Sequence, residues 1–112
     1  GIEFRDCEFG TLSDIHIQQD VDRTAYVSIR NSRSFNISSS FVVGFPETGI
    51  LLENSSECRV TDCTIRPAEN AGGSPSAVTV EGGRANMIVD NIVGAPVNAP
   101  SAAAVARGNE EL

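Results

Sequence analysis

Lysine is absent from this chain of 112 residues, so all eight of its basic side chains are arginines. A lysine nucleophile or Schiff base is therefore excluded, together with the enzymes that depend on one. The chain has one histidine, and its three cysteines show no Cys-x-x-Cys spacing, so the usual ligand set for zinc is missing. Tryptophan is absent and aromatic residues make up only 5% of the chain. The apolar residues are mainly Val, Ile and Ala, which suit a narrow, regularly spaced interior.

Long apolar runs are missing too. No stretch approaches the roughly 20 apolar residues of a membrane-spanning helix, and no signal peptide opens the chain, so we expect no membrane partner. The formal net charge is −7, from 15 acidic and 8 basic residues, which argues against nucleic acid because that partner needs clustered cations. The length favours one domain. The first residue is Gly, so a fragment of a longer protein stays open, and no compartment is indicated.

The strongest pattern is an internal repeat. One fixed shift along the chain places Val27-Ser-Ile29-Arg-Asn31 on Ile50-Leu-Leu52-Glu-Asn54. The same shift superimposes four pairs of apolar or small residues: Phe35 and Cys58, Ile37 and Val60, Ser40 and Cys63, and Val42 and Ile65. A second, slightly longer shift adds five more positions: Val78, Val80, Ile88, Asn91 and Val93. Both shifts fall within the period of about 20–50 residues that is typical of solenoids and related repeat proteins.

Two weaker extensions complete the repeat. A third shift of similar length puts the alanine-rich segment SAAAVARG (101–108) in the position of SAVTVEGG (76–83). In the other direction, FRDCEF (4–9) is aligned with VTDCTI (60–65), so that Phe4, Cys7 and Phe9 take the positions of Val60, Cys63 and Ile65. The segment IHI (15–17) is interpreted as the counterpart of Val27-Ser-Ile29 in the first coil.

Each unit alternates apolar and polar residues over short strands, and turn-forming residues separate these strands. One unit cannot bury its inward face, whereas copies stacked about 4.8 Å apart pair their backbones and align their inward side chains in columns. The pattern resembles right-handed parallel β-helix proteins, the fold of pectate lyases and tailspikes, over residues 2–107. The resemblance implies an all-β fold, a short right-handed parallel β-helix solenoid of about four to five coils with three short strands per coil.

We expect a single domain over residues 1–112. Its predicted parts are an irregular first coil at 1–24, repeat coils at 25–47, 48–75 and 76–100, and a weak last strand and tail at 101–112. Insertions should lie at one edge of the solenoid, because the strands tolerate no change of length. Three connectors rich in Gly, Pro or Ala occupy that position: FPETG, PAENAGGSPS and VGAPVNAPSA.

The cysteines are expected to be buried, reduced thiols that act as small apolar fillers, because free cysteine is among the most buried residue types. Cys7 and Cys63 share a predicted inward column with Ser40 and Asn91. The alternatives are a disulfide, or a catalytic thiol for which His16 is the single candidate base.

One outward column contains the candidate catalytic residues. Arg30, Glu53 and Glu81 are expected to stand on successive coils, where neighbouring carboxylates can raise a pKa or recruit a cation. The resemblance to polysaccharide lyases and hydrolases implies that this face holds a glycan groove. The alternative is a surface ladder in which Arg30 pairs with Glu53 and water solvates the rest.

A second acidic column contains Asp6, Asp62 and Asp90. Aspartate side chains at turns usually accept hydrogen bonds from nearby backbone N–H groups, which is the simplest role for this column. Calcium bound between Asp62 and Asp90 is the alternative, and calcium is the one cofactor that the sequence leaves open.

The third strand of each unit is expected to carry Phe41, Val43 and Ile92 on its outer face. An exposed apolar patch usually indicates a partner, although a loop or the C-terminal tail is an alternative cover. Each end of the stack also exposes a row of backbone groups that another strand can pair with. We therefore expect self-association to a dimer or trimer, through the ends, the patch or both.

These features favour a non-catalytic interaction or assembly module that binds a glycan or a protein, since no convergent acid and base emerge. A first alternative is a polysaccharide lyase or glycoside hydrolase, or a fragment of one, that uses Arg30, Glu53 and Glu81. A second alternative is a structural segment of a larger fibre or tailspike.

Overall fold

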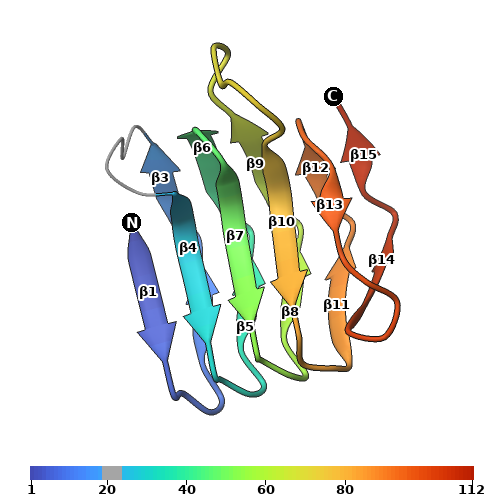
Figure 1. Cartoon of the computed structure of the whole chain (residues 1–112). Helices are drawn as coiled ribbons and strands as arrows, with labels where there is room; N and C mark the ends of the chain where they lie inside the picture. The colour runs from blue at the N-terminus through green and yellow to red at the C-terminus, as the bar shows by residue number, and fades with distance from the viewer. Residues whose placement is uncertain (19–23) are drawn as a thin grey trace.

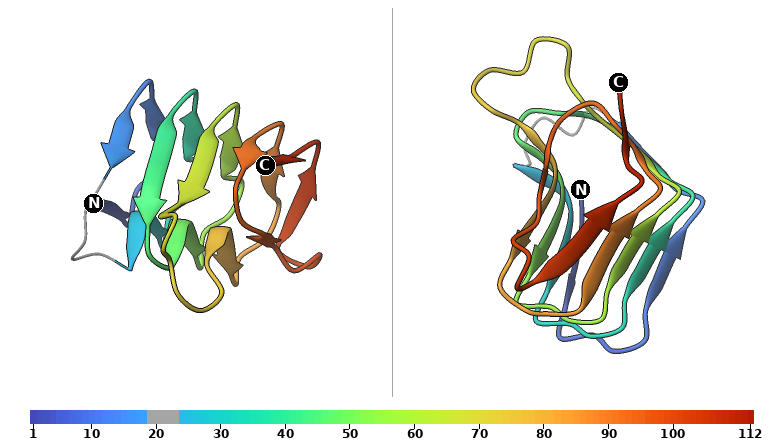
Figure 2. Two further views of the ribbon diagram at one scale, coloured as in Figure 1. Left: turned by 90° about the horizontal axis from the view of Figure 1, so that it is seen from above. Right: turned by 90° about the vertical axis from the view of Figure 1, so that its right-hand side faces the viewer.

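The computed structural model describes residues 1–18 and 24–112. This part of the chain is all-β, without a helix, and it winds as a parallel β-solenoid of about four turns (Figure 1). Successive coils stack side by side, and the view along the solenoid shows that each coil has three sides (Figure 2). The parallel β-helix predicted from the repeat is therefore confirmed. None of the described residues belongs to a helix long and apolar enough to cross a membrane.

Three parallel sheets, each with five of the described strands, form the sides of the solenoid. The first sheet contains β1 (Ile2–Arg5), β4 (Ala25–Arg30), β7 (Thr48–Glu53), β10 (Ser76–Glu81) and β13 (Val97–Asn98). The second sheet contains β2 (Thr11–Ser13), β5 (Asn36–Ser38), β8 (Arg59–Thr61), β11 (Asn86–Val89) and β14 (Ala104–Arg107). The third sheet contains β3 (His16–Gln18), β6 (Phe41–Phe45), β9 (Thr64–Pro67), β12 (Ile92–Val93) and β15 (Glu110–Glu111).

The core consists of inward columns that cross the coils. Three of them follow the register of the ladders: Val27, Ile50 and Val78 in the first sheet, Ile37, Val60 and Ile88 in the second, and Val42, Ile65 and Val93 in the third. All of these side chains are buried. The first two shifts read from the sequence are the ones that bring these partners together.

Buried polar side chains bridge neighbouring coils at the corners. The side chain of Asn91 accepts a hydrogen bond from the Cys63 N–H (2.9 Å) and donates one to the Val60 carbonyl (3.0 Å). Asn86 bridges in the same way, to the Cys58 N–H (3.0 Å) and the Ser55 carbonyl (2.9 Å). Among the described residues, every buried side-chain nitrogen or oxygen has a hydrogen-bond partner, so these corners carry no penalty for unsatisfied polar groups.

The corners turn through residues with positive φ, which also stack from coil to coil. Two such columns lie between the first and second sheets, and one lies between the second and third. They contain Asp6, Asn31, Asn54 and Gly82; Phe9, Ser34, Glu57 and Ala85; and Asp14, Ser39, Asp62, Asp90 and Gly108. Asn, Asp and Gly tolerate this left-handed conformation best, so the turn residues noted in the sequence mark these corners.

The alignment of FRDCEF with the second sheet was wrong. Strand β1 pairs with β4, which places Phe4 beside Ile29, and the Cys7 N–H donates to Oγ of Ser32 (3.1 Å). Cys7 and Asp6 therefore belong to the first corner, whereas Asp62 and Cys63 belong to the corner between the second and third sheets. Both corners carry the same local pattern, a strand followed by a left-handed residue and a small inward residue. This shared pattern misled the alignment.

Two further assignments need correction. The segment SAAAVARG does not continue the first sheet: β14 pairs with β11 in the second sheet, and the two residues of β13 pair with β10. The first-sheet strand of the last coil therefore lies within VGAPVNAPSA, which was interpreted as a connector. At the start, His16–Gln18 forms the third-sheet strand β3, not a counterpart of Val27–Ile29. Residues 1–18 thus hold three strands in register, in place of the predicted irregular coil.

Ala85 offers a test of the stacked corner geometry. It is exposed and has a φ of 59°, a conformation that is unfavourable for alanine and free of steric cost for glycine. We expect Ala85→Gly to raise the free energy of unfolding by about 0.5–1 kcal/mol, after the greater freedom of glycine in the unfolded chain is offset. Urea denaturation measures this change.

Ala102→Gly is the matched control. Ala102 is also exposed but does not have a positive φ, so glycine there should leave the free energy of unfolding unchanged or lower it. An Ala85→Gly protein that is less stable than its parent would show that residue 85 does not occupy a left-handed corner.

Candidate functional site

The column predicted to be catalytic lies on the outer face of the first sheet. The ladders place Arg5, Arg30, Glu53 and Glu81 in one line across β1, β4, β7 and β10. Arg30 Nη1 donates to Glu53, and Arg30 Nε donates to Oε1 of Glu3 at 3.2 Å. The Arg30 and Glu53 side chains are 28% and 31% exposed, so Arg30 is held between two carboxylates. This arrangement favours the self-neutralising surface ladder over a catalytic face.

Glu3 extends this ladder at the edge of the sheet. It forms an ion pair with Arg5 as well as with Arg30. The hydrogen bond from Arg5 lowers the pKa of Glu3 from its ordinary value, so the carboxylate stays charged at neutral pH. Both arginines at this edge therefore already have an acidic partner.

Asp62 and Asp90 are neighbours in the column between the second and third sheets, whereas Asp6 lies in another corner. Their φ values are 55° and 58°, which gives both residues a structural role in the turn. In the ranges 1–18 and 24–112, no group of three or more His, Cys, Asp and Glu side chains is placed to hold a metal ion. Calcium across this pair is an expectation that no geometry here supports.

The three cysteines are free thiols with one shared structural role. Cys58 and Cys63 are buried and Cys7 is half-buried. Each thiol donates to the carbonyl two residues earlier, at 3.3 Å for Cys7 and Cys63 and 3.4 Å for Cys58. The hydroxyls of Ser32, Ser40 and Ser55 make the same contact. Serine and cysteine are therefore equivalent at these corners. His16, the candidate base for a catalytic thiol, lies exposed on the outside of β3.

The outer face of the third sheet contains the predicted apolar patch. Phe41 is 51% exposed and Ile92 is 44% exposed, and Thr64 lies between them in the same outward column. The His16 ring continues this column, with its centroid 5.8 Å from that of Phe41. Val43 is half-buried and faces outward two residues along β6. The structure thus places Phe41, Val43 and Ile92 on one face, with polar residues interleaved.

A groove runs beside this patch, across the coils. Its floor is the next outward column, formed by Gln18, Val43, Arg66, Gly94 and Leu112, and one wall is the start of the loop 68–75. The groove has a volume of about 1000 Å³. A β-carbon added at Gly94 would lie 2.9 Å from Cγ of Arg66, so the Arg66 stem rests over this glycine. We call this feature the third-sheet groove.

Sequence reasoning missed most of the third-sheet groove. The pattern placed Val43, Arg66 and Gly94 outward on the third strands of successive units and identified 67–76 as a connector, but the connector was interpreted as a cover and not as a wall. Figure 2 shows the corresponding loop projecting from the corner between the third and first sheets. The outward alternation of β3, β6 and β9 was the available signal, because it places Gln18, Val43 and Arg66 in one line.

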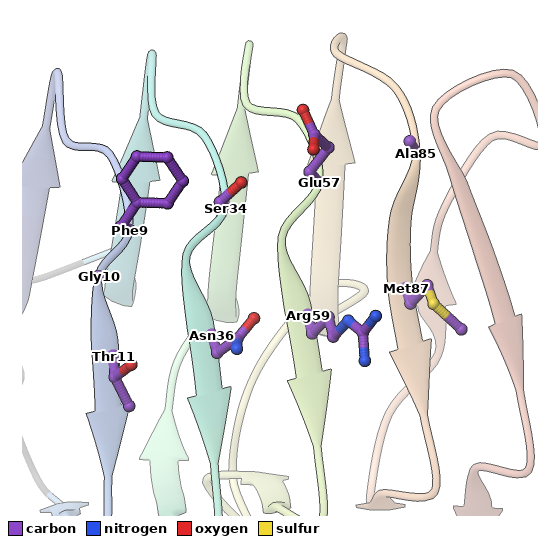
Figure 3. Close-up of a pocket in the computed structure, with 9 residues that line it drawn as sticks. All are labelled: Phe9, Gly10, Thr11, Ser34, Asn36, Glu57, Arg59, Ala85 and Met87. Carbon is purple, nitrogen blue, oxygen red and sulfur yellow. The ribbon is translucent and has the colours of Figure 1, made fainter.

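A second depression, of about 520 Å³, lies on the outside of the second sheet (Figure 3). One row of its lining consists of the strand residues Thr11, Asn36, Arg59 and Met87, and the other of the left-handed residues Phe9, Ser34, Glu57 and Ala85. In Figure 3 the two rows lie side by side and cross successive coils. Its described lining contains strand and corner residues alone, and its volume is about half that of the third-sheet groove.

A comparison of the chain with protein-family models, curated proteins and solved structures finds no match. The resemblance to pectate lyases and tailspikes therefore rests on the solenoid architecture alone. Function has to be inferred from the surfaces described above.

The buried thiols predict a dependence of stability on pH. Burial raises the pKa of Cys58 and Cys63 above the ordinary value of 9.0. A raised pKa in the folded state stabilises the fold while the unfolded thiols are protonated, and this contribution is lost as the pH rises above about 9. We expect the free energy of unfolding to fall between about pH 8.5 and 10.

Urea denaturation at several pH values measures this loss, and the variant Cys58→Ala/Cys63→Ala should show a smaller one. Burial also raises the pKa of Tyr26 above its ordinary 10.0, so a residual loss at higher pH should remain in the variant. Equal pH dependence in the parent and the variant would contradict the burial of the two thiols.

Proposed function

We propose that this protein is a non-catalytic binding module and that its ligand is a neutral glycan held in the third-sheet groove. The observation that carries the proposal is the groove itself, an outward column of mixed character bordered by an inserted loop. Ligand sites are usually concave, with apolar surface and a few polar groups that fix orientation. The third-sheet groove has both features.

The lining suits a chain of sugar rings. Val43, Pro67 and Ala68 supply apolar surface. The polar side chains are the amides of Gln18 and Asn70, the guanidinium of Arg66 and the carboxylate of Glu69. Together these groups offer both donors and acceptors, which is what pairs of neighbouring hydroxyls require. Phe41, two residues from Val43 on the same face of β6, adds an exposed ring on which a sugar can stack.

The charge of the site favours a neutral ligand. Within the described lining, Arg66 is the one basic side chain and Glu69 the one acidic side chain, so they balance. The chain as a whole has a net charge of −7, which repels polyanions such as uronic-acid polymers. A neutral polysaccharide fits both conditions.

The lining also argues against hydrolysis. Glycoside hydrolases usually place two carboxyl groups on either side of the bond that they cleave. Glu69 is the one acidic side chain among the described residues of the groove, and Arg30 and Glu53 on the first sheet are paired with each other. The groups that line the groove therefore suit binding and not cleavage.

Isothermal titration with a panel of neutral oligosaccharides of gluco, xylo, manno and galacto type tests the proposal. We expect at least one to bind, and we expect Arg66→Ala and Phe41→Ala each to weaken that binding about tenfold, equivalent to about 1.4 kcal/mol. Gly94→Ala should weaken it as well, because the new methyl group lies on the floor of the groove and displaces the Arg66 stem.

Arg59→Ala is the matched control, since Arg59 lies exposed on the second sheet in the smaller depression. Binding that is lost in Arg59→Ala and kept in Arg66→Ala would move the site to the second sheet. Failure of the whole panel to bind would refute the glycan proposal, and release of unsaturated or shortened products from any sugar would replace it with an enzymatic one.

A further inference from the structure

We infer that two copies of this chain associate head to head through their first coils, with β1 pairing antiparallel with β1 of the second copy. This inference concerns the end of the solenoid and is independent of the third-sheet groove. It follows from a difference between the two ends of the described structure.

Within the described residues, the first coil carries the inward columns of the core and has a neighbouring coil on one side only. Ile2, Phe4, Leu12 and Ile17 lie in register with Val27, Ile29, Ile37 and Val42. The second set is at most 1% exposed, whereas the first set is half-buried. Within the described residues, β1, β2 and β3 are edge strands of their sheets. An apolar cross-section framed by three strand edges is a surface for strand addition.

The last coil is built differently. In β15, Glu111 occupies the inward position beside Val93, and in β14, Ala106 occupies the position beside Ile88. Prolines 96 and 100 flank the short strand β13. Inward charges, short edge strands and prolines are the usual devices that prevent another strand from pairing. A second copy added at this end would bury the Glu111 carboxylate, so head-to-tail stacking is disfavoured. A head-to-head contact between two first coils instead gives a closed dimer with two-fold symmetry.

The sequence of β1 selects one register. Ile2 and Phe4 face inward and Glu3 and Arg5 face outward, and opposed residues of an antiparallel pair must share a face. With Phe4 opposite Phe4 of the second copy, Glu3 stands opposite Arg5 of the second copy, twice by symmetry. A register two residues away places Glu3 opposite Glu3, which is repulsive. The first register is therefore the favoured one.

The other two edges fit the same symmetry. A two-fold axis through the middle of β1 exchanges the second and third sheets, so that β2 meets β3 of the second copy. Both strands have three residues with a half-buried middle residue between exposed ones, Leu12 in β2 and Ile17 in β3. Leu12 of each copy then covers Ile17 of the other, and all three strand edges gain partners.

Sedimentation equilibrium at micromolar concentrations tests the inference. The parent should be a dimer. Glu3→Arg should raise the dissociation constant roughly tenfold, because it opposes like charges in two places. The exchange Glu3→Arg/Arg5→Glu should restore the parent value. Phe4→Glu should give a monomer, and circular dichroism verifies that this variant is folded. If it is unfolded, the dissociation constant of Glu3→Arg is the test of the interface.

Val105→Glu is the control, because Val105 is 50% exposed on the outside of β14 at the other end. Its dissociation constant should equal that of the parent. A parent that remains monomeric, a Glu3→Arg dimer as tight as the parent, or an exchange variant as weak as Glu3→Arg would each overturn the inference. Arg66→Ala should dimerise normally, so failure of the glycan proposal and failure of this one are distinguishable.

Thiol labelling gives a second readout on the parent protein. Cys7 is half-buried in the first coil, and Cys58 and Cys63 are buried, so a maleimide reagent should react first with Cys7. Its rate should fall as the protein concentration rises through the dissociation constant. A rate independent of concentration would place Cys7 outside the interface and contradict the head-to-head arrangement.

Discussion

The parallel ladder between adjacent coils is the interaction on which the rest of this structure depends. It pairs each strand with the strand one coil away in the same sheet, so backbone partners are separated by a whole coil of sequence. Because the ladder keeps side chains in register, Ile37, Val60 and Ile88 form one continuous buried column. The corner amides of Asn86 and Asn91 satisfy the backbone groups that the ladders leave at the turns. The core and the corners thus follow from a single register.

This dependence explains which parts of the fold were predictable. In the middle coils, β-branched and apolar residues alternate with polar ones. Buried columns of this kind accept few other residue types. The register that aligns Val27, Ile50 and Val78 could therefore be predicted from the sequence. At the ends, one neighbour is missing and the constraint weakens. Asp6-Cys7 and Asp62-Cys63 satisfy the same corner geometry at different corners. Likewise, a two-residue strand such as Val97–Asn98 has no alternation to detect.

For the outward residues, the sequence predicted which sheet face each side chain lies on but not its contacts. The alternation placed Phe41, Val43 and Ile92 on one face, and it placed Arg30, Glu53 and Glu81 in one line. It did not show that Arg30 is held by Glu3 as well as by Glu53, since Glu3 reaches it from the neighbouring coil. Nor did it show the third-sheet groove, whose wall is an inserted loop that follows no repeat. The ladders determine the position of each outward side chain on its sheet. Its interaction partners depend on contacts that do not follow the repeat.

Nuclear Overhauser contacts between methyl groups test the register most directly. With isoleucine and valine methyls labelled, we predict contacts from Ile37 to Val60 and from Val60 to Ile88, and none between Ile37 and Ile88, which are two coils apart. We also predict contacts from Ile2 to Val27, which would distinguish the pairing of β1 with β4 from the alignment of FRDCEF with the second sheet. Contacts between strands adjacent in sequence, in the pattern of antiparallel hairpins, would contradict the stacked solenoid and every surface derived from it.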